Sequence, residues 1–272
     1  MLVNLREILA PAKGYAVPAF NTYNLETVMG VIRGAEEQRA PVIIQVYSRL
    51  FKEGSGYYLA PVIMAAARAA SVPVCFHLDH GASSVEVVRG IRYGCSGIMI
   101  DASKRPVEEN IALTRDIVRQ CGYAGIPVEG EIGHVGTVDD AVGEATTVEE
   151  AKTFAEATGV AALAIAVGTA HGRYRRAPKL DIQRISQIKA ATAVPLVLHG
   201  GSGVPDGQIQ EAIRAGISKI NFGTDVCRAF LDAVFAASRD VYAVDLFMKP
   251  AISSVQAFAE SKIKLLGAGG RA

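Results

Sequence analysis

Three histidines stand at the ends of short apolar stretches, and each is followed by glycine. His80 ends the first stretch, His171 follows the second and His199 follows the third. Apolar runs bounded by turn residues are typical of buried strands. Three protein ligands with one open position are the common arrangement around a catalytic zinc ion. We therefore interpret His80, His171 and His199 as ligands that converge on one metal ion.

Three further residues bear on this site. His77 lies inside the first apolar stretch and is typical of a histidine in a barrel core, whereas His134 follows a later stretch and is expected to be solvated. Glu131 ends that later stretch and is interpreted either as a fourth or alternate ligand or as an acceptor that orients an imidazole. A phosphate-contacting or structural role is the alternative for His171 and His199.

Two glycine-rich turns predict an anion site. The run Gly200-Gly201-Ser202-Gly203 precedes a helix pattern, and so does Asn221-Phe222-Gly223-Thr224-Asp225. Backbone N–H groups in such loops, together with a helix N-terminus, favour a phosphate. Of the basic residues after His171, we expect Arg175 to contact the anion.

The elements that must position these residues alternate between strand and helix. Strands are expected at residues 16–20, 42–46, 74–78, 97–100, 128–132, 162–167, 196–198 and 219–222. Helical patterns lie at residues 25–39, 85–93, 107–121, 148–158, 182–191 and 208–215. This alternation predicts an α/β fold, a closed (β/α)₈ TIM barrel with extra C-terminal helices within residues 225–266. Nothing marks a second domain, so residues 1–272 are expected to form one.

Active sites of such barrels lie at the C-terminal ends of the strands. Asp79 and His80 are consecutive there, and strict alternation would send their side chains to opposite faces. Both reach one site only if the chain leaves extended geometry, which Gly81 would permit. The metal hypothesis therefore carries a geometric condition.

Composition narrows the class of protein. Half of the 272 residues are apolar, and 28 Lys and Arg nearly balance 27 Asp and Glu. This balance argues against nucleic acid or an anionic membrane as partner. The four cysteines show no CxxC spacing, and no apolar run approaches a membrane span. We expect a cytoplasmic protein.

Taken together, the motifs resemble the class II, zinc-dependent fructose/tagatose-bisphosphate aldolases. The resemblance covers nearly the whole chain and rests on these runs: Phe20-Asn21, Leu78-Asp79-His80-Gly81, Glu129-Gly130-Glu131-Ile132-Gly133, Gly168-Thr169-Ala170-His171-Gly172-Arg173-Tyr174, Leu198-His199-Gly200-Gly201-Ser202-Gly203 and Lys219-Ile220-Asn221.

The resemblance implies reversible aldol cleavage of a ketose 1-phosphate or ketose 1,6-bisphosphate to dihydroxyacetone phosphate and an aldehyde. One zinc ion per subunit would polarise the ketone, and Asp79 would be the acid/base. A monovalent cation, Na⁺ or K⁺, and a homodimer or homotetramer are also implied. Substrate or phosphate contacts are implied for Asn21, Gly172, Arg175, Gly200, Ser202, Asn221 and Thr224.

Three departures from the family pattern matter. Asp139 stands where the family carries a loop glutamate that exchanges a proton, so either Asp139 or another group does this work. Tyr47 precedes Ser48 where the family often has a serine. Asp245 replaces an arginine that grips the far phosphate across a subunit interface in many members.

An aspartate repels a phosphate, so we predict a substrate whose aldehyde half lacks one. Substitute anchors are the alternative, and the candidates are Arg49, Lys52, Arg105 and Arg176. A catalytically inactive, phosphosugar-binding barrel that acts as a sensor or scaffold is the alternative from another class. A metal-dependent barrel hydrolase is disfavoured because such enzymes usually carry a His-x-His pair on the first strand, and this chain has none.

Overall fold

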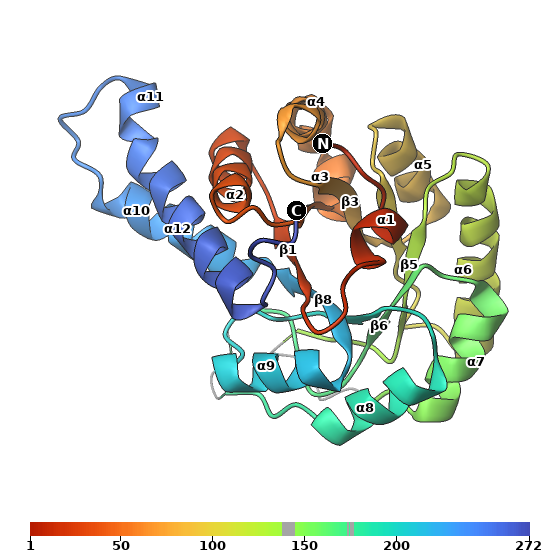
Figure 1. Cartoon of the computed structure of the whole chain (residues 1–272). Coiled ribbons are helices and arrows are strands. Elements are labelled where there is room, and N and C mark those ends of the chain that lie inside the picture. The colour runs from red at the N-terminus through yellow and green to blue at the C-terminus, as the bar shows by residue number, and fades with distance from the viewer. Residues whose placement is uncertain (138–144, 173, 175–176) are drawn as a thin grey trace.

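Eight parallel strands close into a barrel that helices cover from outside (Figure 1). The computed structural model describes residues 1–137, 145–172, 174 and 177–272. Each strand pairs with the next along the chain, and β8 closes the barrel against β1. The strands are β1 Val17–Asn21, β2 Val42–Tyr47, β3 Val74–Gly81, β4 Gly97–Ile100, β5 Val128–Ile132, β6 Ala162–Ile165, β7 Leu196–Leu198 and β8 Ile217–Phe222. The predicted TIM barrel is confirmed.

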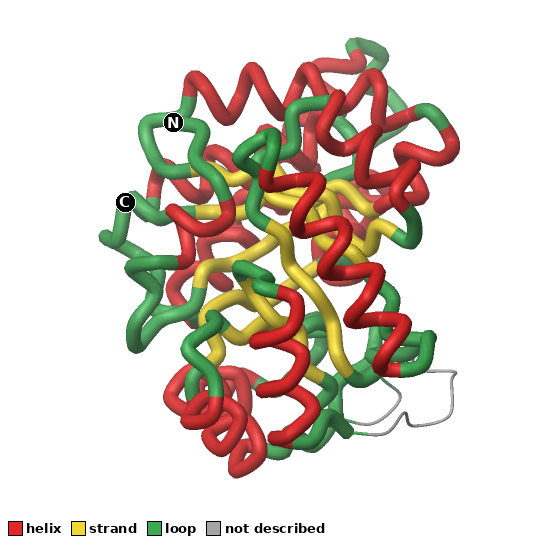
Figure 2. Tube along the Cα trace, turned by 90° about the vertical axis from the view of Figure 1, so that its right-hand side faces the viewer, coloured by secondary structure: helices red, strands yellow, loops and turns green. Residues whose placement is uncertain are grey.

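The strands are buried on both faces, as parallel strands covered by helices must be. Among their residues only Tyr47, the last residue of β2, is exposed. Figure 2 shows the strands enclosed by helices in the perpendicular view. Five strands differ from the predicted bounds. The β1 strand lies one residue later, β2 continues to Tyr47 and β3 to Gly81, β6 stops at Ile165, and β8 begins at Ile217.

The helices between the strands lie where the apolar periodicity placed them, with two additions. They are α2 Leu25–Glu37, α3 Ser48–Glu53, α4 Ser55–Ala69, α5 Ser84–Arg92, α6 Val107–Gly122, α7 Val148–Thr158, α8 Ile182–Ala191 and α9 Asp206–Ala215, and a short helix α1 Leu5–Leu9 precedes β1. We specified no helix for the segment that forms α3 and α4. Gly54, in the left-handed conformation between them, and Pro61 inside α4 obscure the helical pattern of that segment.

The C-terminal segment forms α10 Thr224–Ala236, α11 Val244–Phe247 and α12 Lys249–Leu265. The α12 helix packs against α2 and α10 on the outside of the barrel. The approach of α12 to α2 is close, because a Cβ built on Gly30 would lie 2.7 Å from Val255 Cβ. The far ends of α10 and α12, with α11, project from the barrel (Figure 1).

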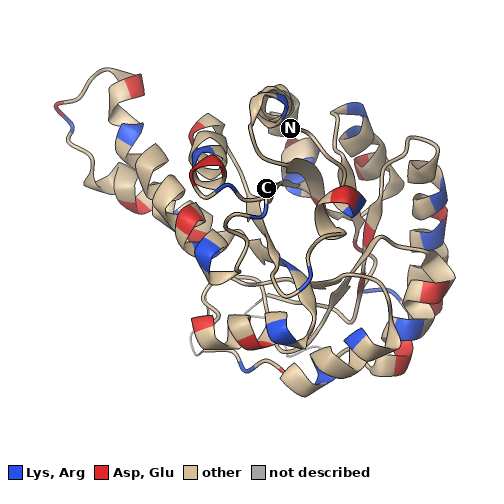
Figure 3. Ribbon diagram, viewed as in Figure 1, with Lys and Arg blue, Asp and Glu red and all other residues tan. Residues whose placement is uncertain are grey.

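Charges of both signs are mixed along the outer helices (Figure 3). This mixing matches the near balance of 28 basic and 27 acidic residues. In the described part of the chain, every helix is too short or too polar to cross a lipid bilayer.

Candidate active site

The end of β3 brings two consecutive polar side chains to the mouth of the barrel. His80 adopts a left-handed backbone with φ of 52°, and the pairing of β3 with β4 shifts register between Leu78 and Gly81. This irregularity breaks strand alternation, so Asp79 and His80 both face the site. We expected Gly81 to provide the departure, and the structure places it at His80 instead. A left-handed non-glycine residue costs about 1–3 kcal/mol and is concentrated at functional sites.

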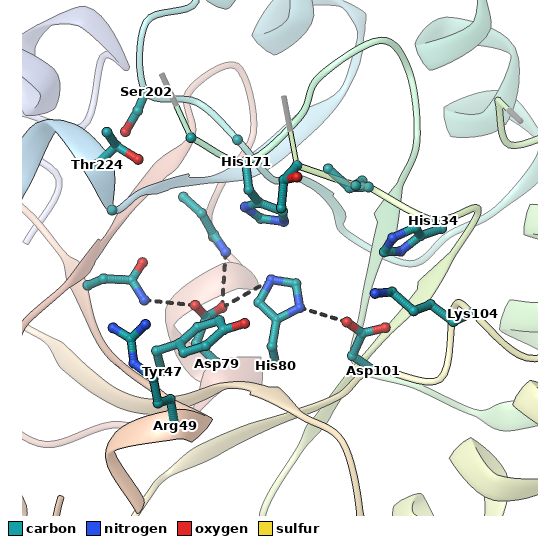
Figure 4. A pocket seen from close by; sticks show the side chains of 18 of the residues that line it. Tyr47, Arg49, Asp79, His80, Asp101, Lys104, His134, His171, Ser202 and Thr224 are labelled. Atoms are coloured by element: carbon teal, nitrogen blue, oxygen red, sulfur yellow. Dashed lines mark hydrogen bonds and ion pairs between the residues drawn. The ribbon is translucent and has the colours of Figure 1, made fainter. Parts of the chain in front are cut away.

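Three imidazole rings meet at this mouth. The ring centroid of His80 lies 4.9 Å from that of His171 and 4.8 Å from that of His199, and the last two are 5.8 Å apart. One ligand nitrogen of each ring lies within 4.8 Å of the others. Figure 4 shows His171 and His80 facing each other beside Asp79. The geometric condition that sequence left open is therefore met.

One nitrogen of each ring makes no hydrogen bond within the described residues, although that of His199 lies 3.3 Å from Glu131 Oε2. His80 Nε2, His171 Nε2 and His199 Nδ1 are buried and make no hydrogen bond to any described residue. Two of these rings are held from the other side, because His80 Nδ1 lies 2.8 Å from Asp101 Oδ2 and His199 Nε2 lies 2.9 Å from Glu129 Oε1. A carboxylate behind a histidine fixes which nitrogen offers its lone pair, as in zinc sites. The donor set fits a divalent cation.

Glu131 lies beside the imidazole cluster. Its Oε1 accepts a hydrogen bond from the backbone N–H of Val135 at 3.1 Å, and its Oε2 lies 3.3 Å from His199 Nδ1. Glu131 Oε2 has no hydrogen-bond partner among the described residues. Together with His80 and Asp101, Glu131 also forms a second group of closely spaced ligand atoms. This geometry suits Glu131 both as a ligand and as an acceptor that orients His199.

A buried network of charged side chains lies beneath the imidazole cluster. No role for this network was predicted from the sequence. Lys219 Nζ lies 2.8 Å from Glu129 Oε2, and His77 Nε2 lies 3.6 Å from the same oxygen. All three side chains are fully buried. Strand residues two apart share a face, so the spacing of Glu129 and Glu131 was an available signal for an inward-facing pair. His77 lies in the barrel core, as its place in the strand predicted.

Asp79 is held by three amide side chains. Asn21 Nδ2 donates to Oδ2 at 2.7 Å, and Gln45 Nε2 donates to Oδ1 at 2.8 Å. Asn221 Nδ2 lies 3.4 Å from Oδ1. Asn21 and Asn221 were expected at the site from the sequence, whereas Gln45, which lies two residues before the end of β2, was not. These donors fix the carboxylate at the pocket floor.

Burial and neighbouring charges shift the pKa values of the imidazole rings in different directions. Burial, followed by the charges of His80 and His199, lowers the pKa of His171 to about 3. Burial alone would lower the pKa of His199, but the carboxylates of Glu129 and Glu131 raise it to about 10.

His80 and Asp79 shift each other's pKa in the expected directions. Burial lowers the pKa of His80, yet Asp79 and Asp101 outweigh this effect, so the pKa is raised. Burial raises the pKa of Asp79, but His80, His199 and Lys219 hold it below its ordinary value. Asp79 is therefore ionised at neutral pH, which suits a proton acceptor.

The other end of the pocket gathers the residues expected to bind phosphate. A cavity of about 320 Å³ is lined by Asn21, Asp79, His80, His171, Gly172, Gly200, Ser202, Asn221 and Thr224, among others. Ser202 Oγ accepts from the backbone N–H of Asp225 at 3.2 Å, which places it at the N-terminus of α10. A Cβ on Gly200 would lie 2.4 Å from Ala170 O, so only glycine fits there. Ser202 and Thr224 lie together in Figure 4.

Two predicted residues, Asp139 and Arg175, lie outside the described residues. His134, expected to be solvated, is partly buried instead: its Nδ1 lies 3.1 Å from Ser103 Oγ and it lines the pocket. The loop after β5 folds back over the barrel mouth at this point, where the backbone N–H of His171 donates to Gly136 O at 2.8 Å.

The fold and the imidazole cluster define a TIM-barrel protein with a candidate metal site at the strand ends. Residues 3–271 match the family described as Fructose-bisphosphate aldolase class-II. The chain is 36% identical to a 6-phospho-5-dehydro-2-deoxy-D-gluconate aldolase of Bacillus licheniformis and 38% identical to one of Shouchella clausii, each alignment covering 99% of this chain and 96% of the relative.

Among solved structures, the YdjI aldolase of Escherichia coli K12 is similar, with 36% identity and a TM-score of 0.91 over all of both chains. The chain belongs to the class II fructose-bisphosphate aldolase family. It is an aldolase, an enzyme that cleaves a phosphorylated sugar.

Proposed function

We propose that the enzyme catalyses zinc-dependent, reversible cleavage of a ketose phosphate to dihydroxyacetone phosphate and an aldehyde that carries no phosphate. The observation that carries this proposal is the set of three buried nitrogens on His80, His171 and His199 that make no hydrogen bond within the described residues and lie beside Asp79. An imidazole cluster with a neighbouring carboxylate suits metal-assisted proton transfer next to a carbonyl group.

His80, His171 and His199 would hold the zinc ion, with Glu131 as a further ligand or as an acceptor that orients His199. When bound, zinc supplies Lewis-acid polarisation of the substrate ketone. The chain's own contribution is to keep the ligand nitrogens aimed at one point. Asp101 and Glu129 do this for His80 and His199 through the hydrogen bonds described above. A monovalent cation near Gly172 and Gly200 is proposed from the resemblance alone.

Asp79 would take the proton from the substrate hydroxyl at the bond that breaks, and would return it in the condensation direction. Its carboxylate is ionised because neighbouring positive charges hold its pKa down. Asn21 and Gln45 leave it little freedom to rotate, so its lone pairs have fixed directions. A general base must lie within hydrogen-bond reach of its proton, and Asp79 lines the pocket. For the second proton transfer we propose Asp139, from the resemblance.

The phosphate of the dihydroxyacetone half would rest on Ser202, Thr224 and the glycines at Gly172 and Gly200. The start of α10 supports this placement, because a helix of 13 residues directs its first N–H groups and its positive dipole end there. Asn21, Asn221 and Arg175 complete the proposed substrate contacts.

The aldehyde half is proposed to lack a phosphate. Asp245 lies exposed on α11, in the segment where the family's phosphate-gripping arginine would stand. The substrate in the names of the two curated relatives carries its phosphate at carbon 6, its ketone at carbon 5 and a carboxylate at carbon 1. Cleavage between carbons 3 and 4 would leave the phosphate on one product and the carboxylate on the other. We propose a substrate of this kind for this chain.

A homodimer or homotetramer is also proposed. The projecting part of α10 and α11, with the loop between them, exposes Phe235 by 81%, Tyr242 by 89% and Val244 by 69%. Contiguous exposed apolar side chains are typical of interfaces between protein chains. We further propose that residues 1–272 act as a single domain and that the enzyme is cytoplasmic.

The test is an aldolase assay that follows release of dihydroxyacetone phosphate. We expect cleavage of 6-phospho-5-dehydro-2-deoxy-D-gluconate with a kcat/KM at least about tenfold above that for fructose 1,6-bisphosphate. Chelation should abolish activity and zinc should restore it. Comparable kcat/KM values for both substrates would contradict the proposed substrate, and activity indifferent to chelation would contradict the zinc mechanism.

A further inference from the structure

The pocket carries two cationic side chains in its described part, and they lie on opposite sides. Arg49 and Tyr47 lie together on the side of Asp79, whereas Lys104 lies beyond Asp101 next to His134 (Figure 4). Both Arg49 and Lys104 are exposed, and neither has an ion-pair partner among the described residues.

Four basic residues were candidates, from the sequence, to anchor the far end of the substrate, and the structure places only some of them at the pocket. Arg49 lines the pocket. Arg105 lines a different cavity, which it shares with Asn110 and Glu150. Lys52 is exposed on α3 and does not line the pocket. Arg176 lies outside the described residues. Arg49 is therefore the candidate that the described structure places at the reacting groups.

Arg49 is positioned by β2 and the first turn of α3. Tyr47 pairs with Asp79 in the register of β2 and β3, and its ring centroid lies 5.7 Å from that of His80. The Arg49 guanidinium carbon lies 5.7 Å from the centre of the Tyr47 ring. A guanidinium over an aromatic face is held by the ring without losing its N–H donors. Tyr47 therefore lies next to both Asp79, the proposed acid/base, and the Arg49 guanidinium.

The position of Asp79 indicates which part of the substrate meets Arg49. In Figure 4, Asp79 lies between the His80 imidazole and the Arg49 side chain. A substrate whose ketone lies at the imidazoles and whose breaking bond lies at Asp79 would continue past Asp79 with its aldehyde half. Tyr47 and Arg49 line the pocket on that side.

We propose that Arg49 is a specificity-determining residue that binds a carboxylate at the far end of the aldehyde half. This inference rests on the proposed function, because it assumes that the ketone lies at the imidazoles and the breaking bond at Asp79. A guanidinium presents parallel N–H donors that match the two oxygens of a carboxylate. A phosphate dianion carries more charge than one guanidinium neutralises, and the nearby Asp79 and Asp101 carboxylates oppose further negative charge. The chemical class selected is an aldehyde that ends in a carboxylate.

The test compares two three-carbon aldehydes that differ only at the far end, 3-oxopropanoate and 3-hydroxypropanal, in condensation with dihydroxyacetone phosphate. Arg49→Gln should lower kcat/KM for 3-oxopropanoate by about tenfold or more, since charged hydrogen bonds are lost. The same variant should keep the kcat/KM for 3-hydroxypropanal within about threefold of the wild-type value. Arg49→Lys should retain more of the acid preference than Arg49→Gln. Lys52→Gln removes the same charge from the same helix outside the pocket and should leave the ratio of the two rates unchanged.

Each other outcome overturns the proposal in a recognisable way. Equal loss with both aldehydes would mean that Arg49 is structural, and no loss would mean that it does not touch the acid. A selective loss in Lys104→Gln instead would place the acid on the opposite wall. If the wild type condenses neither aldehyde, the proposed function itself fails. Thermal unfolding of each variant checks that the exposed substitution leaves the fold intact.

Discussion

His199 Nε2 lies 2.9 Å from Glu129 Oε1, and Glu129 in turn lies 2.8 Å from the ammonium group of Lys219 through its other oxygen. This chain of contacts runs from β8 through β5 to the imidazole and is fully buried. Because Nε2 donates to Glu129, Nδ1 is the nitrogen left to face His80 and His171. The barrel core thus sets the orientation of a proposed zinc ligand.

Removing both charges of this network should weaken zinc binding without unfolding the protein. In the double variant Glu129→Gln with Lys219→Met, a neutral amide replaces the carboxylate and holds His199 less firmly. Loss of such supporting partners typically costs about 10- to 100-fold in metal affinity. Competition with a chromophoric chelator would measure this loss. An unchanged zinc affinity in the folded double variant would show that the network does not orient His199.

Removing Lys219 alone should destabilise the fold. Lys219→Met leaves Glu129 buried without its ammonium partner, and breaking a buried pair in this way costs about 3–5 kcal/mol. Urea denaturation should show this loss, and the double variant should recover much of it. Lys264→Met, on the exposed side of α12, is the matched control and should change stability by less than about 0.5 kcal/mol. A Lys219→Met loss as small as the control's would contradict the structural role.

Asp79→Ala should separate chemistry from metal binding. We expect turnover to fall by about 100-fold to 10,000-fold, the usual contribution of a general acid or base. Zinc affinity should change little, because the proposed ligand nitrogens belong to the three histidines. In His199→Ala, by contrast, the main effect should be the loss of zinc binding. Near-normal turnover in Asp79→Ala would remove Asp79 from the proton-transfer step.

Zinc binding should weaken as pH falls. The carboxylates of Glu129 and Glu131 overcome burial and raise the pKa of His199 to about 10, and the pKa of His80 is also raised. Below these pKa values both rings carry protons, which zinc must displace because only a neutral imidazole nitrogen ligates. The association constant should therefore fall about tenfold per pH unit for each displaced proton. Calorimetric titrations in two buffers of different ionisation heat would count the protons. Binding without proton release would contradict these protonation states.

Much of the fold could be predicted because its strands are apolar runs followed by polar residues and glycine. The α3 and α4 helices could not be assigned, since Gly54 and Pro61 interrupt the pattern that a helix normally shows. The histidines and glycine-rich loops were visible as strand-end residues, and barrel closure alone was needed to bring them together. The two-residue spacing of Glu129 and Glu131 was a further signal that they share a face, but no role was predicted for Glu129.

Other features of the site depend on contacts that spacing does not encode. The pairing of Glu129 with Lys219 joins β5 and β8, which lie far apart in sequence and are separated in the barrel by β6 and β7. The left-handed backbone of His80 could not be predicted, since only a few per cent of residues other than glycine adopt it, even though histidine is among the enriched ones. Gln45 was missed because a single glutamine in an apolar strand is not distinctive until its contact with Asp79 is seen.

Anomalous diffraction at the zinc edge, from crystals of the zinc-loaded enzyme, tests the central claim most directly. We expect one peak per chain at about 2.0–2.1 Å from His80 Nε2, His171 Nε2 and His199 Nδ1. A peak bound through other atoms, or no peak among the three rings at full zinc loading, would contradict the assignment of these histidines as the metal site.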